Sequence, residues 1–235
     1  MNTMRAGMLP GTVAREGTPM ASRLAVLALA SVAVFAATLV ALHLLRADVS
    51  PLAQGISHYG NGSYRWILPV ANGVLGIGGL ALVLGLALGV APAGRSVTGL
   101  VLLGLWSAAQ LITACFPIDA PGAPPTLAGT IHGLAGLSFV AATAAALLLA
   151  RGFGRDTRWA AFARPAGALA LALLAAALVL YVLIEPFAGL GIGGAAQRVY
   201  WTFLLAWLAW TALGLRNAAA GSRTQARRSL SPRGP

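Results

Sequence analysis

Charged residues are scarce in this chain of 235 residues, at 9%, whereas hydrophobic residues make up 58%. An ordinary soluble domain carries roughly 25% charged residues. This scarcity argues against a water-soluble globular domain and predicts a protein that resides in a lipid bilayer. Alanine, glycine and leucine dominate, a bias typical of GC-rich bacterial genomes, so we expect a bacterial inner-membrane protein.

Lysine is absent, and all sixteen basic residues are arginines, which gives a net charge of +11 against five acidic residues. The arginines stand between or beyond the apolar runs and are not interleaved with aromatic residues on an amphipathic face. We therefore expect no nucleic-acid partner.

Cysteine occurs once, at Cys115, which excludes an internal disulfide. We expect Cys115 to be a small buried apolar residue. Suitable zinc ligands exist, but none has a tight spacing such as HxxxH, so we expect no metal and no other cofactor. These side chains are His43, His58, His132, Asp119 and Glu185.

Long apolar runs predict an all-α fold, a polytopic transmembrane bundle of six helices. A spanning helix needs about 20 mostly apolar residues, and backbone groups in lipid must be hydrogen-bonded internally. Six runs qualify: 24–45, 66–90, 97–116, 127–150, 165–184 and 195–215. The first run is longer than the hydrophobic region of a signal peptide, so it is interpreted as a retained span.

The domain organisation follows from these runs. We expect a disordered leader over 1–23, the transmembrane domain over 24–216 and a disordered basic tail over 217–235. Arginine is concentrated in the leader, the even-numbered connections and the tail, so the positive-inside rule places both termini in the cytoplasm. In the last outer connection, Gly189, Gly191 and Gly194 match GxGxxG, but no strand precedes them, which excludes a dinucleotide site.

Polar side chains gather near the predicted outer surface. Ionisable groups within a membrane are costly and tend to face the bundle interior, so we expect an outer-facing pocket among spans two, three, four and six. Its candidate ligand-binding residues are Ser57, His58, Asn72, Gln110, Tyr181, Glu185, Gln197 and Arg198. Trp66, Tyr200 and Trp201 are expected to form an aromatic belt at the same boundary.

The segment FPIDAPGAPPTLAGTIHG brings Asp119 and His132 close together in sequence. A carboxylate that orients an imidazole is the arrangement of a general base, so these two residues are the candidate catalytic pair. The alternative is a structural hydrogen bond that ties the connection onto the fourth span. Thr126 is a candidate N-cap of that helix.

Three segments carry a resemblance to a known family. They are LRADVSPLAQGISHYGNGSYRW, LWSAAQLITACFPIDAPGAPPTLAGTIHGLAG and GIGGAAQRVYWTFLLAWLAW. Together they resemble the six-span membrane proteins of domain of unknown function 998, from Leu24 to Arg216. The matching positions are Ser57, Phe116, Pro117, Asp119, His132, Gln197, Arg198 and Trp207. His58 departs from the pattern, because an acidic residue is expected after the serine. The resemblance implies a membrane protein and no established activity.

Three function classes stay open. The first is a protein that binds a lipid or small amphiphile in the outer pocket, with membrane lipids as its surroundings. The second is a hydrolase or transferase acting on a lipid headgroup with His132 and Asp119. The third is a small transporter, which the scarcity of polar residues in the inner half disfavours.

Overall fold

The computed structural model describes residues 19–184 and 190–230 and consists of helices and their connections. The main helices are α1 (Pro19–Leu45), α2 (Ile67–Gly89), α3 (Val97–Cys115), α4 (Leu127–Gly136), α5 (Phe139–Phe153), α6 (Ala160–Leu178) and α7 (Gly193–Leu230). The short elements are η1 (Ile56–Gly60), η2 (Pro92–Gly94), η3 (Thr157–Trp159) and a π-helical turn, η4 (Val179–Ile184). Six helical stretches are long and apolar enough to span a membrane, which confirms the predicted all-α six-span fold.

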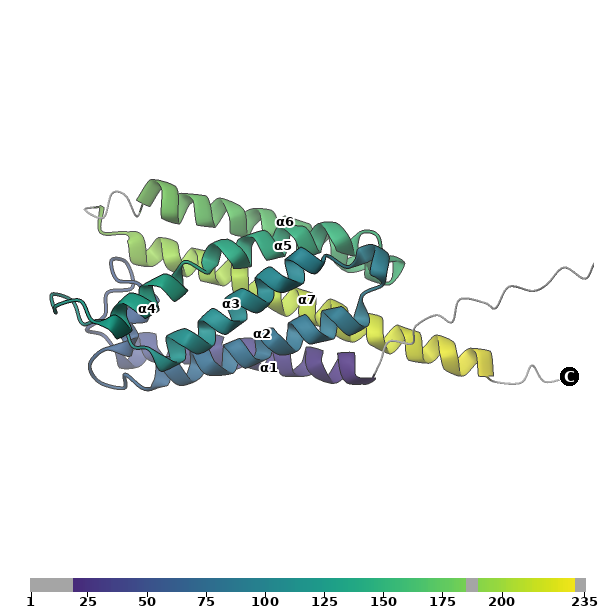
Figure 1. Cartoon of the computed structure of the whole chain (residues 1–235), viewed down its shortest axis with the longest axis horizontal. Coiled ribbons are helices and arrows are strands. Elements are labelled where there is room, and N and C mark those ends of the chain that lie inside the picture. The colour runs from purple at the N-terminus through teal and green to yellow at the C-terminus, as the bar shows by residue number, and fades with distance from the viewer. Residues whose placement is uncertain (1–18, 185–189, 231–235) are drawn as a thin grey trace, which may run out of the picture.

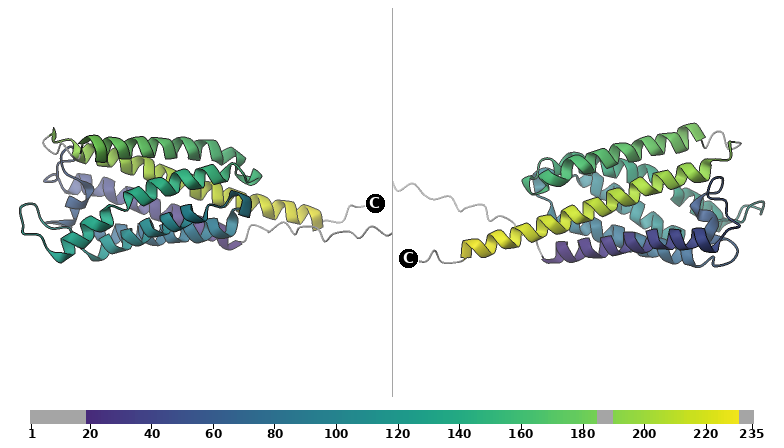
Figure 2. Two further views of the ribbon diagram at one scale, coloured as in Figure 1. Left: turned by 45° about the horizontal axis from the view of Figure 1, so that its top comes forward. Right: turned by 180° about the vertical axis from the view of Figure 1, so that it is seen from behind.

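The spans form a closed ring in chain order. α1 packs on α2, α2 on α3, α3 on α5, α5 on α6 and α6 on α7, and α7 returns to pack on α1. The first residues of α1 and the last turns of α7 lie at the same end of the elongated bundle (Figures 1 and 2). An even number of spans explains this placement.

Small residues bring the helices together at the core. Gly85 and Gly89 of α2 pack against Leu215 of α7, and a Cβ added at either glycine would stand 2.5 Å from a Leu215 methyl group. In a bilayer such close approach supplies the packing energy that expulsion of water supplies in solution. By contrast, a Cβ at Gly133 would meet nothing within 4 Å, so this glycine does not mediate helix packing.

The fourth span is broken, where the sequence predicted one continuous helix over 127–150. α4 ends at Gly136 and α5 begins at Phe139. Between them the amide groups of Leu137 and Ser138 donate to the carbonyls of Leu134 and Ala135, three residues back, at 3.1 Å. Such tightening is frequent at helix ends, and Gly/Ser pairs are common sites of kinks.

The ends of the bundle also differ from the sequence-based boundaries. α1 begins at Pro19, within the predicted leader, since proline is well suited to a first helical turn. α7 continues to Leu230, although the tail from 217 onward was expected to be disordered. The alanines at 218–220 are strong helix formers, and an existing helix extends at little cost. The prediction that Cys115 is buried was wrong: it is the last residue of α3 and is exposed.

Candidate functional site

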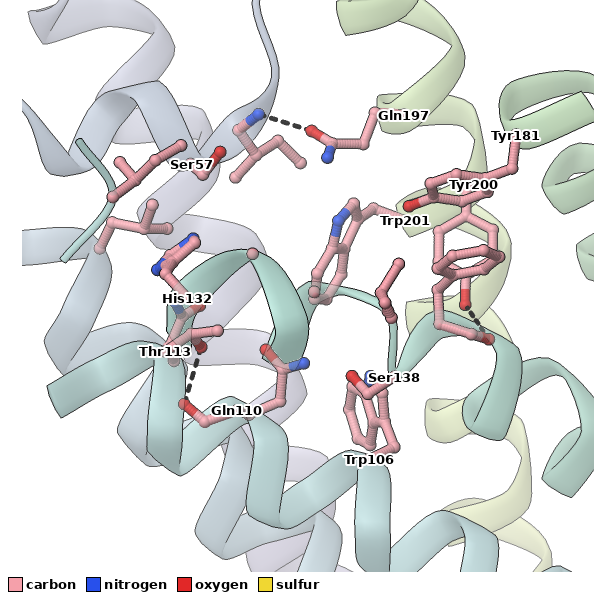
Figure 3. A pocket seen from close by; sticks show the side chains of 18 residues that line it. Ser57, Trp106, Gln110, Thr113, His132, Ser138, Tyr181, Gln197, Tyr200 and Trp201 are labelled. Atoms are coloured by element: carbon pink, nitrogen blue, oxygen red, sulfur yellow. Dashed lines mark hydrogen bonds between the residues drawn. The ribbon is translucent and has the colours of Figure 1, made fainter. Parts of the chain in front are cut away.

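A cavity of about 410 Å³ lies at the end of the bundle opposite the described chain ends. Its wall is formed by residues of η1, the start of α2, the end of α3, α4, the start of α5, η4 and the start of α7. Its lining residues are Ile56, Ser57, Leu68, Asn72, Trp106, Gln110, Thr113, Ile118, His132, Gly133, Gly136, Leu137, Ser138, Phe139, Tyr181, Gln197, Tyr200 and Trp201. Figure 3 shows these side chains around the hollow.

Two carboxamides face the cavity from neighbouring helices. Asn72 of α2 is 8% exposed and Gln110 of α3 is 6% exposed, and both line the cavity. Within the described part of the chain, neither side chain forms a hydrogen bond, whereas most buried polar side-chain atoms in folded proteins have a partner. The accessible face of each carboxamide is therefore its face toward the cavity.

A third carboxamide closes the cavity on the side of α7. The Ile56 backbone N–H donates to Gln197 Oε1 across 2.6 Å (Figure 3). Because a backbone N–H can only donate, the amide oxygen must face Ile56 and the amide NH₂ is directed elsewhere. A Cβ at Gly55 would lie 2.9 Å from Gln197 Oε1, so glycine permits the approach of this connection to α7.

His132 reaches from α4 to the end of α3. Its Nδ1 lies 2.9 Å from the Phe116 carbonyl oxygen. Since a carbonyl only accepts, Nδ1 carries the proton, and in the neutral imidazole Nε2 is left as an acceptor at the cavity wall.

Asp119 has a different partner from the one predicted. Its carboxylate accepts hydrogen bonds from the Thr126 amide at 3.0 Å and the Thr126 hydroxyl at 2.6 Å. Thr126 in turn accepts from the Gly129 amide, which makes it the N-cap of α4, as expected from the sequence. The Thr126 hydroxyl, and then its amide, hold the pKa of the Asp119 carboxyl below its usual value.

The expected direct contact between His132 and Asp119 is therefore not made. The carboxylate is engaged by Thr126 and the imidazole by Phe116, and Asp119 does not line the cavity. The two side chains instead anchor α4 at two separate points. This arrangement leaves His132 without an orienting carboxylate.

Aromatic rings form much of the cavity wall. Tyr181 stacks on Phe139 with ring centroids 3.4 Å apart, and Tyr200 meets both rings edge-on. The Tyr200 hydroxyl donates to the Phe139 carbonyl across 3.1 Å. At 1% exposure, Tyr200 is part of the wall rather than of an interfacial belt, whereas Trp66 is 65% exposed as a belt residue would be.

Arg198 lies outside the cavity and holds the connection between α1 and α2. Its Nε donates to His43 Nε2 at 2.8 Å, and its Nη1 donates to the carbonyls of Pro51 and Gln54 at 2.8 Å each. The guanidinium also lies 5.7 Å from the centre of the Tyr59 ring. The Arg198 guanidinium, which was predicted to bind a ligand, is therefore engaged in contacts within the chain.

The other predicted ligand-binding residues differ in their position relative to the cavity. Ser57 lines the cavity, whereas the His58 ring contacts the Gly55 carbonyl at 3.3 Å and does not line it. Glu185 lies outside the described residues. No group of three His, Cys, Asp or Glu side chains within 19–184 and 190–230 is arranged to hold a metal ion.

Several wall residues were not anticipated, among them Trp106, Phe139, Ser138 and Thr113. Phe139 and Ser138 reach the cavity because the fourth span breaks beside them. The glycines of LAGTIHGLAG were the available signal for that break. Trp106 lies one helical turn from Gln110, on the same face of α3, which is the spacing that places residues i and i+4 together.

Comparison with known proteins identifies a family and no characterised relative. The model of the family described as protein of unknown function (DUF998) matches residues 19–214. No curated protein and no solved structure matches the chain. The matched segment includes the first five spans, the sixth as far as residue 214, and every described residue of the cavity wall. The chain therefore belongs to the DUF998 family.

Proposed function

We propose that this membrane protein binds the polar part of a lipid or small amphiphile in the cavity. The observation that carries the proposal is the pair of buried carboxamides, Asn72 and Gln110, which have no hydrogen-bond partner in the described chain. Neither carboxamide is among the fully buried polar atoms of the described chain that lack a partner, so both remain accessible from the cavity. A ligand that forms hydrogen bonds with both side chains would gain about 0.5–1.5 kcal/mol from each bond.

The shape of the cavity supports an amphiphile that enters from the bilayer. The deep wall is buried, with Trp106 and Tyr200 each 1% exposed. The rim at the break between α4 and α5 is open, and there Leu134 is 64% and Leu137 59% exposed. Ligand pockets commonly measure about 300–1,000 Å³, so 410 Å³ suits a polar head and the first part of a chain. The remaining chain would lie beside α4 in the lipid.

Catalysis by His132 and Asp119 has less support. A general base of this type needs a group that orients the imidazole and raises its basicity, and the Asp119 carboxylate is engaged by Thr126 instead. Transport also has less support, because the unpartnered carboxamides and the cavity lie at one end of the bundle.

We place this end of the bundle on the extracytoplasmic side of the inner membrane. The placement rests on the excess of arginine in the leader, the even-numbered connections and the tail.

Native mass spectrometry of the protein extracted from its membrane tests the binding proposal. The informative variant is Gln110→Met, which keeps the size of the side chain but removes both hydrogen-bonding groups. Thr211→Val is the matched control, because the Thr211 hydroxyl is also buried and unpartnered in the described chain but does not line the cavity. We expect a copurified ligand with wild type and with Thr211→Val, and its loss from Gln110→Met. Equal ligand content in all three proteins would refute the proposal.

A further inference from the structure

Resting on the proposed function, we infer that the polar group recognised in this cavity is uncharged and bears a hydroxyl. The cavity wall contains no Arg, Lys, Asp or Glu among the described residues. Its polar groups are carboxamides, hydroxyls, one imidazole and the indole N–H groups of Trp106 and Trp201. An ionised group that leaves water for such a site would meet no opposite formal charge, and burial of an unpaired charge is far more costly than burial of a neutral polar group.

Three charged side chains at this end of the described chain are already engaged. Arg198 donates to His43 and to loop carbonyls. Arg46, which is 4% exposed, forms a two-point contact with Asp48 through Nε and Nη2, both at 2.7 Å. The Asp119 carboxylate accepts from Thr126. Each would have to abandon these partners in order to turn toward the cavity.

The wall offers both donors and acceptors, which matches a hydroxyl group. Asn72 and Gln110 each present a carbonyl oxygen and an NH₂ group. Gln197 offers only its NH₂, since its oxygen accepts from Ile56. His132 offers Nε2 as an acceptor, since Nδ1 is bonded to the Phe116 carbonyl. A hydroxyl both donates and accepts, whereas a phosphate or carboxylate only accepts and would leave the acceptors of the wall unsatisfied.

An uncharged glycerolipid and its phosphorylated counterpart separate the two possibilities. Dioleoylglycerol and dioleoyl phosphatidic acid have the same chains and differ in the phosphate. Wild type, Gln110→Met and Thr211→Val are reconstituted in phosphatidylcholine nanodiscs that contain one or the other lipid at equal mole fraction. The lipid retained by each protein is measured by native mass spectrometry after release from the disc. Free glycerol, tested by thermal unfolding of wild type and of Gln110→Met in detergent, shows whether the head alone suffices. The difference between the two proteins is the readout, because glycerol is an osmolyte that stabilises proteins without binding a site.

We expect wild type and Thr211→Val to retain dioleoylglycerol about tenfold more than phosphatidic acid, a difference of one decade in affinity, and Gln110→Met to lose this preference. Retention of phosphatidic acid equal to or greater than that of dioleoylglycerol, and dependent on Gln110, would overturn the inference while leaving the proposed function in place. If wild type retains neither lipid above the level of Gln110→Met and glycerol stabilises both proteins equally, both proposals fail. Stabilisation of wild type by glycerol beyond that of Gln110→Met, without retention of either lipid, would support an uncharged hydroxyl ligand and overturn its identification as an amphiphile.

Discussion

Arg198 donates from Nε to His43 Nε2 across 2.8 Å, which joins the start of α7 to the end of α1. The other nitrogen of the imidazole, Nδ1, lies 2.6 Å from the Leu39 carbonyl and must therefore carry the proton. With Nε2 left as an acceptor, the Arg198 guanidinium is held in place and its Nη1 reaches the carbonyls of Pro51 and Gln54. This contact fixes the connection that contributes Ile56 and Ser57 to the cavity wall.

Replacement of Arg198 is expected to destabilise the protein. Arg198→Ala removes several charge-assisted hydrogen bonds, each of which contributes a net of about 1.5–3 kcal/mol when buried. Because one of these bonds is exposed, we expect a loss of about 2–3 kcal/mol in total. Arg198→Lys should also be destabilising, because an ammonium group cannot replace a planar guanidinium that points to several acceptors. Thermal unfolding in detergent and hydrogen exchange over residues 50–60 measure both effects. Arg65→Ala, at an exposed arginine in the same connection, is the control. If Arg198→Lys were as stable as wild type, the planar guanidinium would not be required to hold this connection.

Gln110→Met is expected to stabilise the ligand-free protein. The Gln110 side chain is 6% exposed and has no hydrogen-bond partner in the described chain. Its replacement by an apolar side chain of similar size should therefore raise the free energy of unfolding by up to about 1 kcal/mol. Delipidated protein in detergent, unfolded thermally or chemically, gives the measurement. Thr211→Val should give a comparable gain whether or not ligand is present, because Thr211 is not part of the cavity wall. A lower stability of delipidated Gln110→Met would mean that Gln110 has a structural partner.

The mouth of the cavity can be narrowed without disturbing the core. A Cβ at Gly133 meets nothing within 4 Å, although Gly133 borders the cavity. We expect Gly133→Leu to reduce copurified ligand severalfold while thermal stability is retained, because a glycine inside a helix is about 1 kcal/mol less favourable than a better helix former. Gly104→Leu on α3 is the matched control, because a Cβ at Gly104 also meets nothing within 4 Å and Gly104 does not border the cavity. Equal ligand content of the two variants would argue against entry beside α4.

Acid should loosen the start of α4. The pKa of Asp119 is lowered in the folded protein by its hydrogen bonds from Thr126. A carboxyl whose folded pKa lies below its unfolded value contributes stability above the unfolded value, about 3.9 for aspartate, and loses it as pH falls through the folded pKa. Hydrogen exchange at the amides of Thr126 and Gly129 should accelerate below about pH 4, relative to the rate for an unstructured amide. In Asp119→Asn this additional acceleration should be absent; its persistence would assign the transition to another group.

Labelling of single cysteines tests the orientation in the membrane. In a Cys115→Ser background, Ala123→Cys lies in the exposed connection before α4 and Arg155→Cys in the exposed connection after α5, at opposite ends of the bundle. The excess of arginine on one side predicts that an impermeant thiol reagent added to intact cells labels position 123 and spares position 155. Permeabilised cells, in which both cysteines should react, are the control. The reverse pattern would place the cavity on the cytoplasmic side.

His132 and Asp119 illustrate how far sequence reasoning reaches. Their proximity along the chain predicted a direct contact between them, which was wrong, whereas Thr126 was correctly predicted to be the N-cap of α4. Their actual partners depend on the path of residues 116–126, which folds Asp119 onto Thr126 and leaves His132 facing the Phe116 carbonyl. The proline and glycine residues of this connection predict that it is irregular, but they do not predict the path of its backbone.

The amino-acid sequence by itself determined that this protein spans a membrane six times as helices, and it predicted opposite ends for the excess of arginine and for the polar side chains within the spans. Both conclusions follow from local properties, since apolar length and charge asymmetry are read residue by residue along the chain. Only the tertiary structure decided which polar groups are satisfied. Arg198 and Asp119 found partners within the chain, whereas Asn72 and Gln110 were brought together at a cavity without them. Whether a buried donor or acceptor has a partner depends on the packing of helices that are distant in sequence, and no local pattern encodes that.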